Sequence, residues 1–302
     1  MSQQSSERIA VLLGGTSSER AVSLRSGQAV LEALLSRGVD AFSIDMGKDR
    51  IAQLQAAEFD RAFIIEHGGF GEDGRLQALL EIMGKPYTGS SSAACALAMD
   101  KQTTKHIWRG LGLPVADSVI LQADSDFGQV YDRLGPKIMV KPVSEGSSVG
   151  NFIVHSSVQL EQAYSDASKF GDVMAEAFVE GPEFTVSILR GQALPAIRIE
   201  AQSGVYDYAA KYETGDTLYH IPCGLSAEQE SELQALALTA NQALGCSGWS
   251  RVDFIQGPEG FVLLEVNTVP GMSATSLVPK AAAAIGLDFP ALCQKILETA
   301  HG

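Results

Sequence analysis

Short apolar runs alternate with longer amphipathic stretches along the first third of the chain. Three of these runs predict strands buried on both faces, at residues 9–13, 41–44 and 62–65. Two longer stretches predict helices, at residues 19–37 and 75–83. This alternation of strand and helix predicts a doubly wound parallel sheet.

The pattern changes after Asp100, where shorter elements predict a small α+β domain. Predicted strands occupy residues 118–121, 137–141 and 152–155. Predicted helices occupy residues 101–111, 127–134 and 158–170. A loop rich in glycine and serine, residues 142–150, joins the second and third of these strands.

Longer strands and one well-marked helix follow from about Glu183. Two hairpins are predicted, from residues 184–189 with 194–200 and from residues 249–255 with 261–266. Between the hairpins, Ser226 and Gln229 have the spacing of a capping box at the start of a helix. Residues 201–222 have no clean periodicity, and a long loop in a compact protein is usually functional.

Composition and charge narrow the classes of function. The net charge of −14 disfavours a nucleic-acid binder, because neutralising phosphates requires clustered lysine and arginine. Neither a signal peptide nor an apolar run long enough for a membrane span is recognised. We therefore expect a cytoplasmic protein without nucleic-acid or membrane partners. Its four scattered cysteines are expected to be small buried apolar residues.

Residues 69–74 match the dinucleotide-binding pattern G-x-G-x-x-G between a predicted strand and a predicted helix. Glu72 and Asp73 lie inside this loop, however, and would repel a pyrophosphate. No acidic residue ends a second strand at the distance that a ribose contact requires. A dinucleotide site is therefore disfavoured, and the sequence also lacks a P-loop pattern.

Polar side chains alternate along the last predicted hairpin. Because residues two apart face the same side of a strand, Glu265 and Asn267 project together, as do Arg251 and Asp253. Their oxygen atoms suit Mg²⁺ that bridges nucleotide phosphates, and a solvated polar face is the alternative. Asp253 and Glu265 share a face only if an odd number of residues connects the strands. We expect a three-residue loop that ends with a left-handed Gly260.

Two further segments are candidates for binding a nucleotide. The loop of residues 142–150 follows Lys141, and small residues with free N–H groups can close over phosphates beside a lysine. Residues 176–179 and Glu183 place apolar backbone and two carboxylates at a domain join, where adenine and ribose can bind. The alternatives are a plain surface loop and an interdomain strand with a solvated end.

Seven motifs occur in a fixed order over nearly the whole chain. They are LGGTSSERAVS (13–23), HG…GEDG (67–74), KP…EGSSVG (141–150), GPEFTV (181–186), AKY (210–212), GW…RVD (248–253) and LEVNTVPGM (264–272). This set resembles the D-alanine–D-alanine ligase family of the ATP-grasp superfamily. The resemblance implies an α/β and α+β architecture: a Rossmann-like domain (1–98), a lid domain (99–181) and a C-terminal domain with a large, mostly antiparallel sheet (182–302).

The resemblance also implies a role for each matched residue. In the amino-acid sites, Glu19 binds the ammonium of the first D-alanine, and Ser147 links Glu19 to Tyr212 on a mobile loop. The second D-alanine site is implied at His67, Glu72, Ser276 and Leu277. Arg251 and the Gly271 N–H hold the tetrahedral intermediate. ATP contacts are implied at Lys101, Lys141, Glu176, Ala177, Phe178, Val179, Glu183 and Lys211, and ligands of two Mg²⁺ at Asp253, Glu265 and Asn267.

The implied reaction is ATP-dependent ligation of two D-alanines through an acyl phosphate, for peptidoglycan synthesis. Mn²⁺ in place of Mg²⁺ and a monovalent cation are further candidates, and a homodimer is expected. One alternative is another ATP-grasp ligase, such as a D-alanine–D-lactate ligase, which Tyr212 disfavours. The other is a nucleotide-binding module without turnover, against which Lys141, Arg251 and Glu265 argue.

Overall fold

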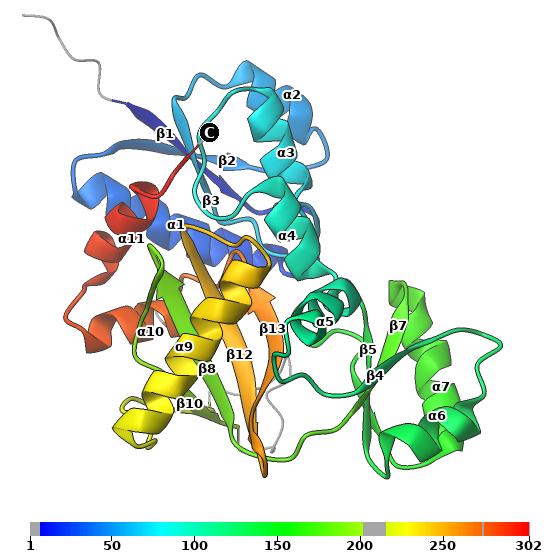
Figure 1. The fold of residues 1–302 in the computed structure, drawn as a ribbon. Helices are drawn as coiled ribbons and strands as arrows, with labels where there is room; N and C mark the ends of the chain where they lie inside the picture. The colour runs from blue at the N-terminus through cyan, green and yellow to red at the C-terminus, as the bar shows by residue number, and fades with distance from the viewer. Residues whose placement is uncertain (1–6, 202–215, 274, 302) are drawn as a thin grey trace, which may run out of the picture.

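Three β-sheets organise the chain in its computed structural model, which describes residues 7–201, 216–273 and 275–301 (Figure 1). The first sheet is parallel, with β1 between β2 and β3. Its strands are β1 (Arg8–Leu13), β2 (Asp40–Asp45) and β3 (Arg61–Ile64). β1 is buried from Ile9 to Leu13, because both edges are paired and helices cover the sheet, so an unbroken apolar run is stable there.

Four helices and one 3-10 turn belong to this first part of the chain. They are α1 (Arg20–Ser36), α2 (Arg50–Ala56), η1 (Gly69–Gly71), α3 (Arg75–Ile82) and α4 (Ser92–Met99). α1 directly follows the Gly14–Gly15 turn after β1, and η1 and α3 follow β3. The loops at the carboxyl ends of β1 and β3 therefore lie side by side, as is usual for ligand sites in parallel sheets.

A small antiparallel sheet with its own core lies apart from the rest and is reached through α5 (Lys101–Gly110) (Figure 1). Its order is β4–β7–β5–β6, and its core includes Ile138, Val140 and Leu160. The strands are β4 (Ser118–Leu121), β5 (Ile138–Pro142), β6 (Phe152–Val154) and β7 (Val173–Ala177). Its helices are α6 (Phe127–Leu134), α7 (Ser157–Ala167) and η2 (Ser168–Phe170).

The largest sheet is antiparallel, in the order β11–β10–β8–β12–β13, with β9 also paired to β8. Helix α9 (Ala227–Ala243) crosses one face of this sheet (Figure 1). The strands are β8 (Glu183–Leu189), β9 (Gln192–Ala193), β10 (Ile197–Glu200), β11 (Leu218–His220), β12 (Trp249–Gly257) and β13 (Gly260–Asn267).

The end of the chain returns to the first sheet. Helices α10 (Leu277–Ala284) and α11 (Phe289–Leu297) share one hydrophobic core with β1 and α1, and α11 lies along α1 (Figure 1). Tyr87 pairs with His301 through backbone hydrogen bonds. This packing brings the segment after β13 next to the loops that follow β1 and β3.

The periodicity of the sequence is confirmed for the longer elements. The predicted strands are present within a few residues of their expected bounds, and the Ser226–Gln229 capping box begins α9. Sequence analysis did not predict α2, α4, α10 or α11. Each has nine residues or fewer and so shows at most about two and a half turns of helical period, although α3 and α6, with eight residues each, were predicted.

The expectation for the cysteines agrees with the structure. Cys95, Cys223, Cys246 and Cys293 are all buried with free thiols, and burial raises the pKa of Cys95 to about 12. In the part of the chain that is described, no helix combines the length and the apolar character needed to cross a membrane.

Candidate active site

A β-bulge sets the polar face of the β12–β13 hairpin. Gly257 pairs with Gly260, so the connection has two residues and the three-residue prediction is wrong. The register shifts between Asp253 and Phe254, and Asp253 pairs directly with Glu265. β13 contributes one extra residue at this bulge. The bulge therefore restores the shared face that a two-residue turn alone would have removed.

Asp253 joins the polar side chains of this face. Arg251 donates two hydrogen bonds to its carboxylate, from Nε over 2.8 Å and from a terminal nitrogen over 2.7 Å. Thr185 on β8 and Asn267 on β13 donate to the same group over 2.6 Å and 3.0 Å. Asp253 is buried, so water competes little with these charge-assisted bonds. The network fixes the Arg251 guanidinium beside Asn267 and Glu265, which are only partly buried.

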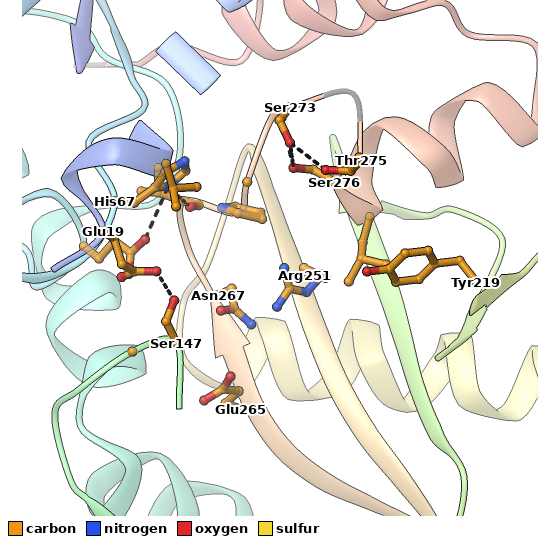
Figure 2. A pocket seen from close by; sticks show the side chains of 17 residues that line it. Glu19, His67, Ser147, Tyr219, Arg251, Glu265, Asn267, Ser273, Thr275 and Ser276 are labelled. Atoms are coloured by element: carbon orange, nitrogen blue, oxygen red, sulfur yellow. Dashed lines mark hydrogen bonds and ion pairs between the residues drawn. The ribbon is translucent and has the colours of Figure 1, made fainter. Parts of the chain in front are cut away.

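Glu19, the residue before α1, turns away from its own helix and toward the glycine–serine loop. Ser147 donates a short hydrogen bond to its carboxylate (Figure 2), and the side chain makes no capping bond. A Cβ on Gly68 would come within 2.6 Å of Glu19 Oε2, so only glycine leaves room there. Ser147 and Ser148 have φ of 49° and 61°, a conformation that costs about 1 kcal/mol or more for such residues. The loop therefore keeps this shape because neighbours such as Glu19 hold it.

A buried histidine ties the first sheet to the segment after β13. His67 Nδ1 lies 2.9 Å from the Val269 carbonyl oxygen, and Nε2 lies 3.2 Å from Ser26 Oγ. A carbonyl oxygen only accepts, so Nδ1 carries a proton and donates to Val269. Glu72 Oε1 lies 3.7 Å from Nδ1. His67 and Glu72 thus lie together, as their expected common role requires.

The chain approaches itself closely where α10 begins. A Cβ on Gly271 would lie 2.9 Å from Ser276 Oγ, so the backbone at Gly271 passes close to the start of the helix. Ser276 is the N-cap residue, and its hydroxyl accepts from the Ser273 N–H over 2.9 Å. Backbone N–H groups and the positive end of the helix dipole favour an anion such as a carboxylate at this place.

These groups line one pocket, formed where the loops after β1 and β3, the glycine–serine loop, the hairpin and the start of α10 meet (Figure 2). Ten of the residues singled out from the sequence line it: Glu19, His67, Glu72, Ser147, Arg251, Glu265, Asn267, Gly271, Ser276 and Leu277. Tyr219 lines it too and was missed. Its only signal was its position in the long stretch without periodicity.

The residues assigned to the nucleotide lie mainly on the small sheet and on α5, outside the lining of this pocket. Lys101 Nζ donates to the Glu145 carbonyl oxygen of the glycine–serine loop over 2.5 Å. Lys141 Nζ lies 2.9 Å from Glu176 Oε2. Lys105 Nζ lies 3.0 Å from the same oxygen. Sequence analysis missed Lys105, although it lies one helical turn after Lys101 and therefore on the same face of α5.

The segment after β7 has few available backbone donors. The Ala177 N–H donates to the Asp117 carbonyl oxygen over 2.9 Å, and the Phe178 N–H to that of Lys137 over 3.1 Å. Among the described residues, no hydrogen-bond partner lies at the Val179 N–H. Of these three amides, Val179 is therefore the one that can donate to a bound base.

Of the three remaining residues predicted from the sequence, only Glu183 is among those that the structure describes. Glu183 starts β8, is partly buried and pairs across the sheet with Ile255. Lys211 and Tyr212 lie outside the described residues.

Glu66, the residue before His67, is a buried carboxylate that sequence analysis missed. Burial raises its pKa to about 7, although Arg50 at 4.0 Å opposes this shift. A Cβ on Gly15 would come within 2.4 Å of Glu66 Oε1. Glu66 thus packs beneath the turn that leads to Glu19.

Comparison with known proteins gives a consistent result. Family models described as "D-ala D-ala ligase C-terminus" and "D-ala D-ala ligase N-terminus" match residues 107–298 and 48–90. A D-alanine–D-alanine ligase of Pseudomonas putida is 51% identical over 96% of this chain and 92% of its own length. One of Aromatoleum aromaticum is 53% identical over 97% and 96%. The crystal structure of the Bacillus anthracis enzyme complexed with ATP superimposes with a TM-score of 0.85 at 32% identity, covering 97% of both chains.

Proposed function

The chain belongs to the D-alanine–D-alanine ligase family, and from this premise we propose how its residues carry out the reaction. It is an ATP-dependent ligase that joins two D-alanine molecules into D-alanyl-D-alanine for peptidoglycan synthesis. One observation carries the assignment of residues. Glu19, Arg251 and Ser276 line the same pocket, where an acid, a guanidinium and a helix N-terminus suit an ammonium, a phosphoryl group and a carboxylate.

The reaction needs two steps because a carboxylate is a poor electrophile. A carboxylate oxygen of the first D-alanine attacks the γ-phosphorus of ATP, and ADP leaves. The amine of the second D-alanine, having lost a proton, then attacks the carbonyl carbon of the acyl phosphate. Phosphate leaves from the tetrahedral intermediate, so the products are ADP, phosphate and the dipeptide. Because an acyl phosphate hydrolyses in water, the pocket has to be closed before the first step.

We assign the first D-alanine to the side of the pocket that contains Glu19. Its carboxylate is buried and already accepts from Ser147, so it is fixed in place to pair with the substrate ammonium. Closure then depends on the loop that carries Ser147. We expect Tyr212 to extend this link from the other side, as the family resemblance implies.

We assign the second D-alanine to the side formed by His67, Glu72 and the start of α10. The N–H groups near Ser276 and Leu277 suit its carboxylate. Arg251 and the Gly271 N–H lie on the same pocket, where they can stabilise the oxyanion of the tetrahedral intermediate. His67 is held between Val269 and Ser26, so it positions this wall.

The donor set of the hairpin fits two divalent cations. Asp253 and Glu265 pair on one face, with Asn267 two residues along, and hard oxygens of this kind suit Mg²⁺ or Mn²⁺. In the described ranges, no three acidic, histidine or cysteine side chains are arranged so that they could hold a metal ion by themselves, so the Asn267 oxygen is needed as a ligand. When bound, the cations would neutralise charge on the transferring phosphoryl group. Arg251, held by Asp253, supplies fixed positive charge beside them.

The remaining family contacts give the nucleotide site. Lys101 and Lys141 are assigned to the phosphates, and Lys211 joins them from its loop. The Val179 N–H is the donor for the adenine edge, and Glu183 accepts from the ribose hydroxyls. Support comes from the Val179 amide just after β7, which has no hydrogen-bond partner in the described part of the chain, and from Glu183 at the start of the next strand.

The test is phosphate release from MgATP with D-alanine and a panel of controls. We expect release that depends on D-alanine and formation of the dipeptide. Release that proceeds equally with D-lactate as the second substrate, with a depsipeptide product, would favour a D-alanine–D-lactate ligase. Binding of nucleotide without any release of phosphate would indicate a nucleotide-binding module without turnover.

We also propose the organisation of the whole enzyme. The three sheets support domains at residues 1–98, 99–181 and 182–302, although α10 and α11 pack against the first domain. A homodimer is proposed from family membership, and size measurement in solution tests it. Because the reaction consumes ATP, we place it in the cytoplasm.

A further inference from the structure

One carboxylate of the small sheet is held by two lysines from different elements. Glu176 is the second-last residue of β7, Lys141 is on the neighbouring strand β5, and Lys105 comes from α5. The two ammonium nitrogens lie 2.9 Å and 3.0 Å from the same oxygen, Glu176 Oε2. Their side chains are 10% and 1% exposed, and that of Glu176 is 5% exposed.

The charges of this triad do not cancel. One carboxylate faces two ammonium groups, so the buried cluster carries a net charge of +1 when all three are ionised. Although burial alone would raise it, Lys141 and Lys105 hold the pKa of Glu176 below its ordinary value. Burial lowers the pKa of Lys105. A net positive cluster at the start of the glycine–serine loop is suited to a polyanion.

The two lysines differ in what they can reach. Lys141 lies near the end of β5, and this strand leads directly into the glycine–serine loop. The phosphates of ATP are assigned to this place. Lys105 is almost fully enclosed and cannot approach a nucleotide without leaving Glu176. If Lys141 turns toward a phosphate, Lys105 is the cation that stays with the carboxylate. Without Lys105, Lys141 would be the only cation paired with the buried Glu176 carboxylate. It would then remain in that ion pair, because an unpaired buried charge is strongly unfavourable.

We propose that Lys105 is a positioning residue for nucleotide binding, which neutralises Glu176 and thereby frees the Lys141 ammonium for the phosphates of ATP. This role rests on the proposed function, which places phosphates at Lys141. It goes beyond that function because Lys105 itself touches no substrate. A purely structural lysine would instead stabilise the fold and leave the affinity for ATP unchanged.

The central experiment is Lys105→Met, with titration of MgATP and of D-alanine in the phosphate-release assay. We expect the KM for ATP to rise about 10- to 100-fold, as for a buried charge pair that loses one partner. The KM for D-alanine is expected to stay within about twofold. Lys105→Arg retains the charge and is expected to recover most of the ATP affinity.

A double-mutant cycle shows whether Lys105 acts through Glu176. In the Glu176→Gln background, Lys105→Met is expected to change the KM for ATP by less than about threefold, because the charge to be neutralised is gone. Lys169→Met is the matched control. Lys169 forms an exposed ion pair with Asp166 on the same lid, so this variant is expected to retain the affinity for ATP of the unmodified protein.

Direct titration with MgATP separates this proposal from the proposed function. If D-alanine causes no phosphate release, the ligase assignment fails, and binding of MgATP to each variant still tests Lys105. If Lys105→Met does not fold, Lys105→Gln takes its place with the same expectation. An unchanged affinity for ATP in a folded neutral variant, with only a lower Tm, would overturn the proposal. So would an effect of Lys105→Met that is equally large with and without Glu176.

Discussion

Replacing Glu19 by glutamine removes one charge and almost no volume from the pocket. The amide oxygen can still accept from Ser147, so the loop contact is retained. What disappears is the attraction between the Glu19 carboxylate and the ammonium of the first D-alanine. The exchange therefore isolates the electrostatic part of substrate binding.

The size of the loss follows from the surroundings of Glu19. Its side chain is 8% exposed, so the pair forms largely away from water. Two unit charges about 4 Å apart attract by about 4 kcal/mol at an effective dielectric constant of about 20. Removing one partner of a buried pair costs about 3–5 kcal/mol. Glu19→Gln should therefore weaken productive binding of the first D-alanine by about two to three orders of magnitude.

Thermal stability should hardly change. An acid in the first turn of a helix contributes about 0.3–1 kcal/mol through the dipole, and Glu19 makes no capping bond to α1. Affinity for MgATP in the absence of D-alanine should also be retained, because Glu19 itself is assigned no contact with the nucleotide and the variant keeps the bond to Ser147.

The assay is a D-alanine titration of phosphate release, beside direct MgATP binding and thermal unfolding. Glu32→Gln is the matched control, since Glu32 is an exposed acid on the same helix and accepts a hydrogen bond from Gln28 on the helix surface. A Glu19→Gln variant with normal dependence on D-alanine and a lower Tm would refute the reasoning. Glu19 would then be only an acid at the start of a helix.

Three further predictions concern a metal ligand, a helix cap and a buried acid. Asp253→Asn should lower the rate of phosphate release at saturating MgATP by about 100-fold, since it weakens both cation binding and the hold on Arg251; an unchanged rate across a Mg²⁺ titration would contradict this. Ser226→Ala breaks the capping box of α9 and should cost about 1 kcal/mol in unfolding free energy, with kcat unchanged; urea unfolding measures the loss, and a fully retained midpoint would count against the cap. Burial raises the pKa of Glu66 from 4.5 to about 7, so the folded state binds this proton more tightly and unfolding free energy should fall as pH rises through that window. Glu66→Gln should remove up to about 3 kcal/mol of this pH dependence in urea unfolding at pH 5 and pH 8, and parallel pH profiles of the two proteins would show that Glu66 does not titrate there.

Local patterns in the sequence predicted the longer elements and most of the chemistry. The apolar run of β1 and the capping box of α9 have physical causes within a few residues, namely burial on both faces and satisfaction of helix N–H groups. The alternation of Glu265 with Asn267 also follows from the two-residue period of a strand. These features could be predicted because no distant segment has to be known.

The hairpin register shows where this reasoning stops. The two-residue period of a strand correctly showed that one extra residue is needed between the strands if Asp253 and Glu265 are to share a face. We had placed this residue in the loop, but the structure has it in a bulge. A bulge and a longer turn have the same effect on parity. Only the pairing with β8 and β13 on both sides of β12 selects between them.

What the sequence by itself determined was the order of strands and helices, the family motifs and the residue types of the site. The tertiary structure decided which of these residues meet. His67 contacts Val269, which is 202 positions away in the sequence, and Ser147 bonds to Glu19, which is 128 positions away. Lys105 and Lys141 both pair with one oxygen of Glu176. Such contacts have no local signature, because packing of whole sheets and helices sets them and each partner is an ordinary polar residue in its own segment. The short helices α10 and α11 are a similar case, since the apolar core they share with β1 and α1 stabilises them more than their own helical propensity.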